Sequence, residues 1–235
     1  MDDDLRSSML RYYDERAPEY EEAFVLGTGT ASIPDPQIFR EEAGLLGAVV
    51  ERWAHGRLMD LACGTGYWLP HYAPQCSQIT LFDQSEGMLD ECRKKIAVHG
   101  IAGKCRLIHG DFFDHEFDSH SYDCALVGFF LSHLTEIQEH SLFSALRNML
   151  GTAGRFLVLD SAWSPARTRH NVKVERQQRR LNNGTPFDIY KRYCDRDDVL
   201  SWADRYHATL SIEHFGAAFF AVSGQFTDGM PTKAI

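Results

Sequence analysis

The sequence has no apolar run that approaches the roughly 20 residues of a membrane-spanning helix. Its first ten residues, MDDDLRSSML, are acidic, whereas a secretory signal peptide begins with basic residues and continues with apolar ones. Internal repeats and low-complexity segments are also missing. We therefore expect a cytoplasmic protein, and the length of 235 residues suits one α/β domain.

Cysteine pairs of the CxxC type are absent, and the six cysteines are scattered. We expect them to be reduced core residues and not disulfides or a zinc site. Because no HxxxH motif or cluster of His and Asp lies near the candidate site loops, we expect no metal. The formal net charge of −9 argues against general binding to nucleic acids.

Positive charge is concentrated in one segment. Residues 167–192 hold eight Lys or Arg and two Asp or Glu, a net of +6, so the rest of the chain carries −9 minus 6, or −15. A basic segment in an acidic protein needs a physical reason.

Strand-like and helix-like patterns alternate along most of the chain. Strand-like runs cover 57–62, 78–83, 105–109, 122–128 and 155–160, and helical patterns cover 5–24, 37–54, 67–73, 86–98 and 136–149. This alternation predicts a parallel sheet with helices on both faces. Between the first two helices, residues 27–36 (GTGTASIPDP) have the composition of a flexible loop.

The end of the chain breaks the alternation. The strand-like runs TLSIEHF and FFAVSGQ are separated only by GAA, a link short enough for an antiparallel hairpin. The predicted fold class is therefore α/β. We expect a Rossmann-like three-layer sandwich with a seven-stranded, mostly parallel sheet that ends in an antiparallel hairpin.

The first strand runs into a glycine turn, LACGTGYW, in which Gly64 and Gly66 allow the main chain to approach a ligand. In open parallel sheets, ligands bind beyond the carboxyl ends of the strands, where the strand order reverses. A dinucleotide fingerprint would have a third glycine at position 69, but Leu69 stands there and Trp68 crowds the place of a pyrophosphate. Cys63, in the same turn, is expected to be a small structural residue.

Acidic residues stand at the end of the second strand and just after the third. Asp83 lies 17 residues after Gly66 and could accept hydrogen bonds from two ribose hydroxyls. Asp111 could accept one from an adenine amino group, while Phe112 packs on the ring. The spacing indicates a nucleoside-like cofactor.

Four segments in this order resemble the class I S-adenosylmethionine-dependent methyltransferases: LMDLACGTGYW, LFDQSEGML, IHGDFF and YDCALVGFFLSHL. The N-terminal YYDERAPEY is similar to the tyrosine-rich lid helix of the small-molecule members, and the terminal hairpin resembles the family's antiparallel seventh strand. The resemblance covers nearly the whole chain and implies S-adenosyl-L-methionine as the cofactor.

The same resemblance implies a role for each matching residue. The implied cofactor-binding residues are, for the methionine part, Asp60, Ala62, Gly64, Gly66 and Gly128; for the ribose, Asp83; for the adenine, Gln84, Met88, Asp111 and Phe112; and, beside these, Trp68, Gly110 and the lid tyrosines Tyr13 and Tyr20. Plain packing of the N-terminal helix is the alternative for the two tyrosines.

The segment after the fourth strand bears on the methyl acceptor. Amino methyltransferases of nucleic-acid bases carry Asn/Asp-Pro-Pro-aromatic there, but this chain reads VGFF. Phe129 and its neighbour Phe130 suggest an apolar wall around a small organic molecule. No nucleic-acid module is visible in the sequence. We expect a small-molecule substrate, neither nucleic acid nor membrane as a partner, and a monomer or homodimer.

The basic segment lies between the fifth strand and the hairpin, where the resembled family commonly inserts substrate-binding elements. Ser164 and Pro165 have the character of a helix N-cap and first position, and Gly184 that of a helix end. These signals predict a helix from Ala166 to Leu181 with few apolar residues, lying over the site or between subunits. The following TPFDIYKR alternates like a strand.

Four basic residues of this segment, Arg179, Arg180, Lys191 and Arg192, are candidates for binding an anionic acceptor, because guanidinium groups suit carboxylates, phosphates and phosphonates. RRLNNGTPFDIYKR and LSHL also resemble, loosely, stretches of bacterial phosphonate O-methyltransferases of this fold. The alternatives are a solvated helix face or salt bridges to the acidic N-terminus, which has eight acids in residues 1–22.

His133 and Asp160 are the candidate catalytic residues. His133 lies five residues beyond Gly128 and could act as a base or as a hydrogen-bond donor to the substrate, unless it only packs. Asp160 ends the fifth strand and could equally hydrogen-bond locally. A base is needed only if the acceptor carries a proton at neutral pH.

We expect a single methyltransferase domain over residues 1–235, with an N-terminal helical lid at 1–36 and a substrate-binding insertion at 161–195. The predicted reaction moves a methyl group from S-adenosylmethionine to an oxygen of a small anionic molecule, a carboxylate or a phosphonate. A nitrogen acceptor is the alternative within the class. A nicotinamide-dependent oxidoreductase and a catalytically silent cofactor-binding protein are the alternatives outside it.

Overall fold

The computed structural model describes residues 2–26, 33, 35–169 and 172–228. Most of the predicted loop GTGTASIPDP, residues 27–32 and 34, therefore lies outside the described residues. None of the described helices is long and apolar enough to cross a membrane.

A seven-stranded sheet forms the centre of the molecule, in the order β3-β2-β1-β4-β5-β9-β8. Its strands are β1 (Gly56–Leu61), β2 (Cys76–Asp83), β3 (Cys105–His109), β4 (Cys124–Gly128), β5 (Arg155–Ser161), β8 (Ala208–Phe215) and β9 (Phe219–Phe226). The first five are parallel, whereas β9 is antiparallel to both β5 and β8. This arrangement confirms the predicted fold class, and the strand order reverses between β1 and β4.

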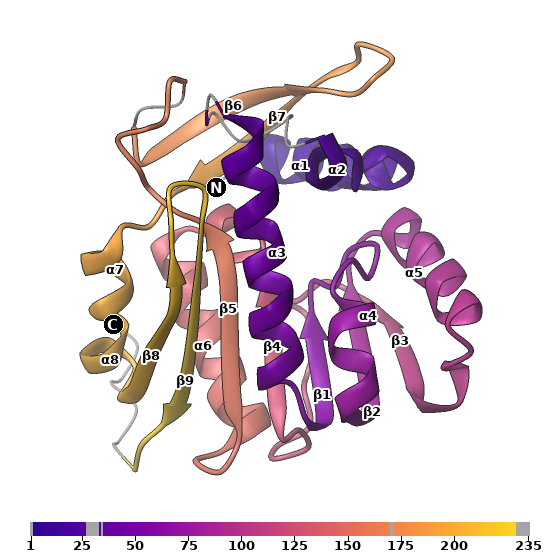
Figure 1. The fold of residues 1–235 in the computed structure, drawn as a ribbon, viewed down its shortest axis with the longest axis vertical. Helices are drawn as coiled ribbons and strands as arrows, with labels where there is room; N and C mark the ends of the chain where they lie inside the picture. Colours follow the sequence, from indigo (N-terminus) through magenta and orange to yellow (C-terminus); the bar gives the residue numbers. More distant parts are fainter. Residues whose placement is uncertain (1, 27–32, 34, 170–171, 229–235) are drawn as a thin grey trace.

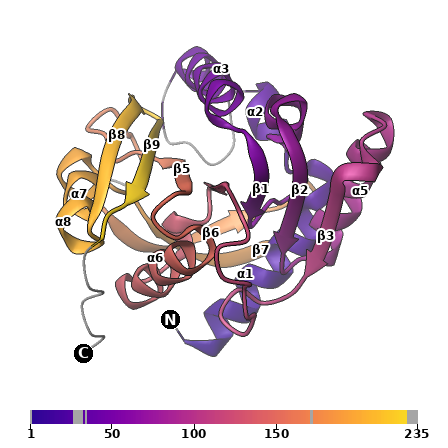
Figure 2. The same ribbon diagram turned by 90° about the horizontal axis from the view of Figure 1, so that it is seen from below.

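Helices cover the sheet on both faces (Figures 1 and 2). One layer contains α3 (Pro36–Trp53), α4 (Leu69–Tyr72) and α5 (Glu86–Val98), and the other contains α6 (Glu136–Leu150), α7 (Arg196–Leu200) and α8 (Trp202–Arg205). Short 3-10 turns η2 (Ala73–Gln75), η3 (Ala102–Lys104) and η4 (Leu131–His133) lie in the connections. The predicted alternation of strands and helices is thereby confirmed.

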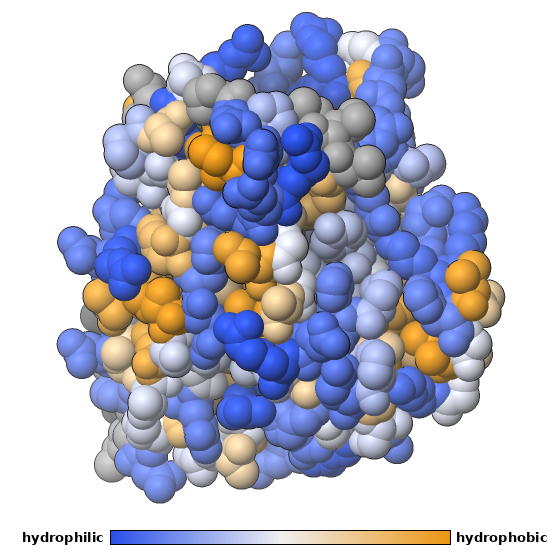
Figure 3. Space-filling view, viewed as in Figure 1, coloured by the Kyte–Doolittle hydropathy of each residue, from blue (hydrophilic) through white to orange (hydrophobic). Residues whose placement is uncertain are grey.

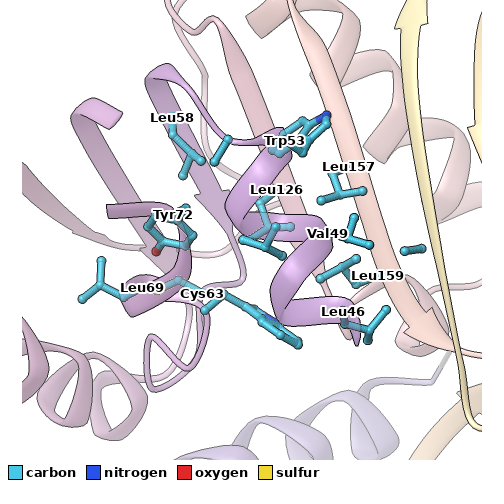
Figure 4. Packing of buried hydrophobic residues seen from close by; sticks show 14 of the residues in the cluster. Leu46, Val49, Trp53, Leu58, Cys63, Leu69, Tyr72, Leu126, Leu157 and Leu159 are labelled. Atoms are coloured by element: carbon cyan, nitrogen blue, oxygen red, sulfur yellow. The ribbon is translucent and has the colours of Figure 1, made fainter. Parts of the chain in front are cut away.

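Two hydrophobic clusters fill the spaces between the layers, because successive strand residues point to opposite faces. Leu58 of β1 packs with the α3 layer, whereas the next residue, Met59, packs with the α6 layer. Figure 4 shows how Leu46 and Val49 of α3 lie against strand residues such as Leu159. These strands are apolar on both faces, as expected of a covered parallel sheet.

The carboxyl ends of the parallel strands are covered by a cap made from two distant parts of the chain (Figure 1). It consists of α1 (Asp3–Arg16), η1 (Ala17–Glu19), α2 (Glu22–Leu26) and the antiparallel pair β6 (Val174–Arg180) and β7 (Pro186–Arg192). A third small apolar cluster joins the parts: Leu5, Met9, Tyr12, Leu181, Phe187 and Ile189.

Hydrogen bonds hold α1 on the body of the protein. The Asp14 carboxylate accepts from Ser85 Oγ at 2.9 Å and from Gly87 N–H at 2.8 Å, at the start of α5. On the other side, Ser8 Oγ accepts from Asp188 N–H of β7 at 3.0 Å. The helix is thus attached both to the central domain and to the hairpin above it.

The predicted helix from Ala166 to Leu181 is wrong, because residues 174–180 form strand β6. Along β6, Gln177 and Arg179 are buried while their neighbours are exposed, a period of two built almost entirely from polar residues. Ser164 Oγ does accept from Ala166 N–H at 3.2 Å, but only in a short turn. Gly184, with φ of 88°, lies in the turn between β6 and β7 and ends no helix.

Candidate active site

The turn after β1 has an unusual backbone, with φ of 56° at Ala62, 55° at Gly64 and 71° at Gly66. A side chain at Gly64 would meet no protein atom closer than Met88 Sδ at 3.9 Å, because this face of the turn borders a cavity. At Gly66 it would come within 2.8 Å of Cys92 Sγ. Gly64 therefore leaves room for a ligand, whereas Gly66 allows α5 to pack closely.

Asp83, at the end of β2, stabilises the same turn. Its Oδ2 accepts from Gly64 N–H at 2.8 Å, and its Oδ1 accepts from Ser85 N–H at 2.9 Å. Burial raises the pKa of Asp83, against the lowering effect of these backbone hydrogen bonds. Since each carboxylate oxygen can accept a further hydrogen bond, Asp83 can still bind hydroxyl groups in the cavity that it lines.

A first cavity, partly open to solvent, lies over the carboxyl ends of β1, β2 and β4. Its lining includes the apolar side chains of Phe82, Met88, Phe112 and Phe113, together with Gly128. An apolar pocket with a few polar groups suits a nucleoside-like ligand.

A second cavity lies beside the first, under the cap. Both cavities are lined by Tyr13, Tyr20, Phe129 and His133, which we call the junction. Phe129 has a positive φ of 57°, a strained conformation for a residue with a side chain, and it directs the ring between the two cavities.

One side of the second cavity is cationic. Arg16 of α1, Arg167 and Lys191 of β7 line it, and no Asp or Glu does so among the described lining residues. Lys191 Nζ lies 2.5 Å from Ser132 Oγ and 3.6 Å from Asp160 Oδ1. Burial lowers the pKa of Lys191 to about 8, opposed by Asp160, so the side chain is mainly charged at pH 7.

His133 and Tyr13 meet at the junction. Nδ1 of His133 lies 2.8 Å from the Tyr190 carbonyl, which can only accept, so this nitrogen carries the proton. Burial holds the pKa of His133 well below its usual value, so the ring is neutral and Nε2 is an acceptor. Tyr13, whose pKa burial raises, donates its hydroxyl hydrogen to Nε2 at 2.6 Å.

The sequence and fold of this domain match known methyltransferases. Residues 58–154 match a family model described as "Methyltransferase domain". Over these residues and in its fold, the chain is similar to the class I S-adenosylmethionine-dependent methyltransferases. The match confirms the resemblance inferred from the motifs of the first four strands.

The similarity to curated relatives is confined to part of the chain. The ubiquinone/menaquinone biosynthesis C-methyltransferase UbiE of Pseudomonas putida is 30% identical over 110 residues, which are 46% of this chain and 42% of that protein. The demethylmenaquinone methyltransferase of Chlamydia pneumoniae is 31% identical over 106 residues, 44% of this chain and 43% of that protein. The chain thus spans about two fifths of the length of the curated relatives it matches.

Solved structures match over more of the chain but at lower identity. DhpI in a complex with SAH superposes with a TM-score of 0.77 at 21% identity, over 97% of this chain and 100% of that one. The cyclase SpnF superposes with a TM-score of 0.65 at 14% identity, over 94% of this chain and 96% of that one. These likenesses show a shared fold, which by itself fixes no reaction.

Nine of the fourteen residues expected at the cofactor line the first cavity: Tyr13, Tyr20, Ala62, Gly64, Asp83, Gln84, Met88, Phe112 and Gly128. Five do not line it: Asp60, Gly66, Trp68, Gly110 and Asp111. Several residues of the second group make their contacts with other side chains of the protein and not with the cavity.

Three of these five residues have clear protein partners. Asp60 accepts from Tyr72 O–H at 2.7 Å, and burial raises its pKa to about 7. Trp68 is buried and stacks on Phe129 with ring centroids 6.1 Å apart, so it helps to fix the position of that junction residue. Asp111 forms a salt bridge with Arg6 of α1, which itself lines the first cavity.

The candidate acceptor-binding residues also divide into two groups. Phe129, His133 and Lys191 line the second cavity. Arg179 is buried, and its positive charge acts on Tyr13, His133 and Lys191, so it belongs to the same cationic region.

Arg180 and Arg192 point elsewhere. Arg180 donates to the Gly184 carbonyl at 3.1 Å on the exposed side of β6. Arg192 pairs with the buried Glu139 of α6. Asp160 lines neither cavity and accepts from Ser132 N–H at 2.8 Å, so its contacts are those of a positioning residue.

Arg16 and Arg167 are cavity residues that the sequence analysis did not identify. Arg167 belongs to the basic segment, but the predicted helix did not indicate that its side chain faces the cavity. Its guanidinium stacks on the Tyr193 ring, 3.9 Å from the centroid, and donates to the Ala162 carbonyl at 2.7 Å. Arg16 lies in YYDERAPEY, where the resemblance implied a role only for the tyrosines.

Proposed function

We propose that the protein transfers a methyl group from S-adenosylmethionine to an oxygen of a small anionic organic molecule. The observation that carries the proposal is the pair of cavities that meet at Tyr13, Tyr20, Phe129 and His133, the second of them with Arg16, Arg167 and Lys191 on one side. The match of residues 58–154 to the methyltransferase domain supports the cofactor and the reaction, and the charge of the second cavity supports the anionic acceptor.

The residues of the first cavity fit the cofactor. Asp83 has acceptor capacity left for the two ribose hydroxyls, and Phe112 and Met88 offer apolar surface to the adenine. The open face of Gly64 leaves room for the methionine part. DhpI, a protein of the same fold, has been solved in a complex with SAM and HEP, which supports a second ligand bound together with the cofactor in such a fold.

S-adenosylmethionine supplies an electrophilic methyl group bonded to a positively charged sulfur. The protein then has to hold an acceptor oxygen in line with that bond and to keep water away. Under this proposal Arg16, Arg167 and Lys191 bind the anionic group, the positive charge of the nearby Arg179 strengthens that binding, and the cap covers the group. Because a carboxylate or phosphonate oxygen is already ionised, no general base is required.

A neutral His133 with an acceptor Nε2 is the one feature that favours an amine acceptor, since an amine must lose a proton. Against this, the cations of the second cavity disfavour an ammonium group. We therefore propose that His133 orients the Tyr13 hydroxyl through their hydrogen bond. The same hydroxyl then contacts the acceptor when the acceptor is bound.

The test has two stages. Calorimetric titration with S-adenosylmethionine should show micromolar binding that Asp83→Ala weakens by about 2 kcal/mol, the scale of a lost charge-assisted hydrogen bond. Asp90→Ala, on the exposed side of α5, is the control and should bind normally. Transfer of labelled methyl groups is then measured to carboxylates, phosphonates and amines. Methylation of amines alone would overturn the proposed acceptor class.

A further inference from the structure

Four phenylalanines form one wall of the second cavity, which we call the aromatic wall: Phe24, Phe39, Phe129 and Phe219. They come from four separate elements, namely α2, α3, the loop after β4, and β9. Their rings touch in sequence, with centroids 5.9 Å apart for Phe24 and Phe39, 4.7 Å for Phe39 and Phe219, and 5.3 Å for Phe129 and Phe219.

The aromatic wall and the cationic side belong to different parts of the cavity lining. Arg16 and Tyr12 come from α1 and Lys191 from β7, whereas the aromatic wall comes from α2, α3, the loop after β4 and β9. Arg167 borders both regions, because its guanidinium donates to the carbonyl of Ala218, which lines the cavity next to Phe219. The cavity therefore offers both cationic and aromatic side chains to one ligand.

Two of the cationic side chains lie beside the junction. The positive charges of Lys191 and Arg179 act on the His133 ring, which also borders the first cavity. An anionic group bound by these cations therefore lies next to the point of methyl transfer. The rest of the ligand then extends along the aromatic wall, from Phe129 at the junction toward Phe39 and Phe219.

We propose that the methyl acceptor is amphiphilic: an anionic head that is itself methylated, joined to an apolar body of about the size of one ring. This inference rests on the proposed function and names its substrate class. A bond forms between a head oxygen and the methyl carbon, and the carbon–sulfur bond of the cofactor breaks with its electron pair left on sulfur. The products are S-adenosylhomocysteine and a methyl ester with one negative charge fewer.

Binding of two matched anions tests the apolar body. Calorimetry is carried out on the full chain saturated with S-adenosylhomocysteine, with methylphosphonate and phenylphosphonate as probes. Because burial of a ring adds several buried carbon groups, phenylphosphonate should bind at least about tenfold more tightly. Equal affinity for the two probes would overturn the inference.

Two substitutions locate the effect. Phe219→Leu, and in a second variant Phe219→Ala, should reduce the preference for the phenyl probe about fivefold or more while the affinity for methylphosphonate stays unchanged. Phe226→Leu is the control, since Phe226 is a buried residue of the same strand that packs on Phe156 and lines neither cavity. A preference that survives both Phe219 variants would contradict the assignment to this wall.

The same experiment separates failure of the inference from failure of the proposed function. If the protein binds S-adenosylhomocysteine and both phosphonates equally, the anion-binding function stands and only the amphiphilic acceptor is refuted. If the wild-type protein binds the cofactor product but neither anion, the proposed acceptor class and this inference are both refuted.

Discussion

The Tyr13 hydroxyl and His133 Nε2 lie 2.6 Å apart, so the cap and the body of the protein meet at the junction of the two cavities. Tyr13 belongs to α1, and His133 belongs to η4 after β4. Neither residue lies near the other in the sequence. The hydrogen bond therefore links the position of the N-terminal helix to the place where we expect methyl transfer.

Replacing Tyr13 by Phe should lower kcat/KM for methyl transfer by about 5- to 100-fold. The change leaves the buried Nε2 of His133 without its donor, a loss of about 1–3 kcal/mol. The affinity for S-adenosylmethionine should change little, because the ring remains. Steady-state kinetics and calorimetry measure the two effects.

Tyr67→Phe is the matched control for this prediction. Tyr67 is another aromatic residue near the junction, and its ring stacks on Phe24 with centroids 4.1 Å apart, but it lines neither cavity. It should keep normal kinetics. Full activity of Tyr13→Phe would show that the Tyr13–His133 hydrogen bond does not contribute to methyl transfer.

The affinity for an anionic acceptor should fall as the pH rises above about 8. Lys191 has its pKa lowered to about 8 by burial, so it loses its proton, and with it its charge, on the alkaline side of that value. The acceptor KM should rise up to about tenfold per pH unit there. Lys191→Arg keeps the charge at high pH, so the rise of the acceptor KM above pH 8 should disappear in this variant. The same rise in the variant would contradict the prediction.

The low pKa of Lys191 also affects the stability of the fold, which should rise with pH where the affinity for the acceptor falls. Its folded pKa is lower than the 10.5 of an ordinary lysine, so between pH 8 and 10.5 the unfolded chain binds more protons than the folded one. The contribution of this residue to the free energy of unfolding therefore becomes more favourable as the pH rises through that window.

The sheet and its first cavity could be predicted from the sequence because apolar strands and glycine turns are local signals. Gly64, Asp83 and Phe112 each stand at or just beyond the end of a recognisable strand, and parallel strands bring their carboxyl ends to one edge. The second cavity could not be predicted to the same extent. Its cations lie on α1, on β7 and on the turn at Arg167, and only the folded cap brings them together.

Strand β6 shows why the cap was the weak point of the sequence analysis. Its inward residues, Gln177 and Arg179, are polar, so a period of two in burial exists without a period of two in hydrophobicity. Arg192 was expected at the acceptor for a related reason. The sequence displays its charge, but its partner Glu139 is distant in the chain and adjacent only in the fold.

Arg192 and Glu139 should therefore affect stability more than substrate affinity. Glu139 is fully buried and also accepts from Tyr206 O–H at 2.7 Å and from Arg205 at 3.1 Å. Glu139→Leu leaves the Arg192 charge unpaired and should lower the free energy of unfolding by about 3–5 kcal/mol. Denaturant unfolding measures the loss.

The double variant Glu139→Leu/Arg192→Met is the control, because it removes both charges and should recover most of that stability. If Arg192→Met alone raised the acceptor KM without lowering stability, Arg192 would bind substrate after all, and its pairing with Glu139 would be secondary.

Glu42 should hold the hairpin side of the second cavity in place. Its carboxylate accepts from the backbone N–H groups of Ala217, Ala218 and Phe219 at 2.8, 3.0 and 2.9 Å. Burial raises the pKa of Glu42, but these bonds and one with His214 outweigh it and lower the pKa below 4.5. The stabilisation is therefore present above pH 4.5 and is lost as the pH falls through the lower, folded pKa.

Glu42→Gln should cost about 2–3 kcal/mol of stability at pH 7, the scale of lost hydrogen bonds to a charged group. Since Ala218 and Phe219 line the second cavity, the acceptor KM should rise while the affinity for S-adenosylmethionine is retained. Thermal unfolding at pH 7 and pH 4 measures the first effect. An equal loss for wild type and variant between these pH values would contradict the role of the carboxylate.

Arg179 and Arg180 provide the sharpest test of the cationic region, because they are neighbours with the same side chain on opposite faces of β6. Arg179 is buried toward Lys191 and His133, whereas Arg180 is exposed beside Gln178. Arg179→Met should raise the acceptor KM about tenfold or more, because it removes a buried positive charge beside the anion, where screening by solvent is weak. Arg180→Met should leave it unchanged.

The pair separates a local anion site from a general effect of positive charge. Both variants lower the net charge of the cap by the same amount, so a long-range field would weaken acceptor binding equally in the two and would be screened by salt. A tenfold difference that persists at high ionic strength would locate the site on the inner face of β6. If instead Arg180→Met proved the more harmful, the anion would bind outside the cap, and the second cavity would not be the acceptor site.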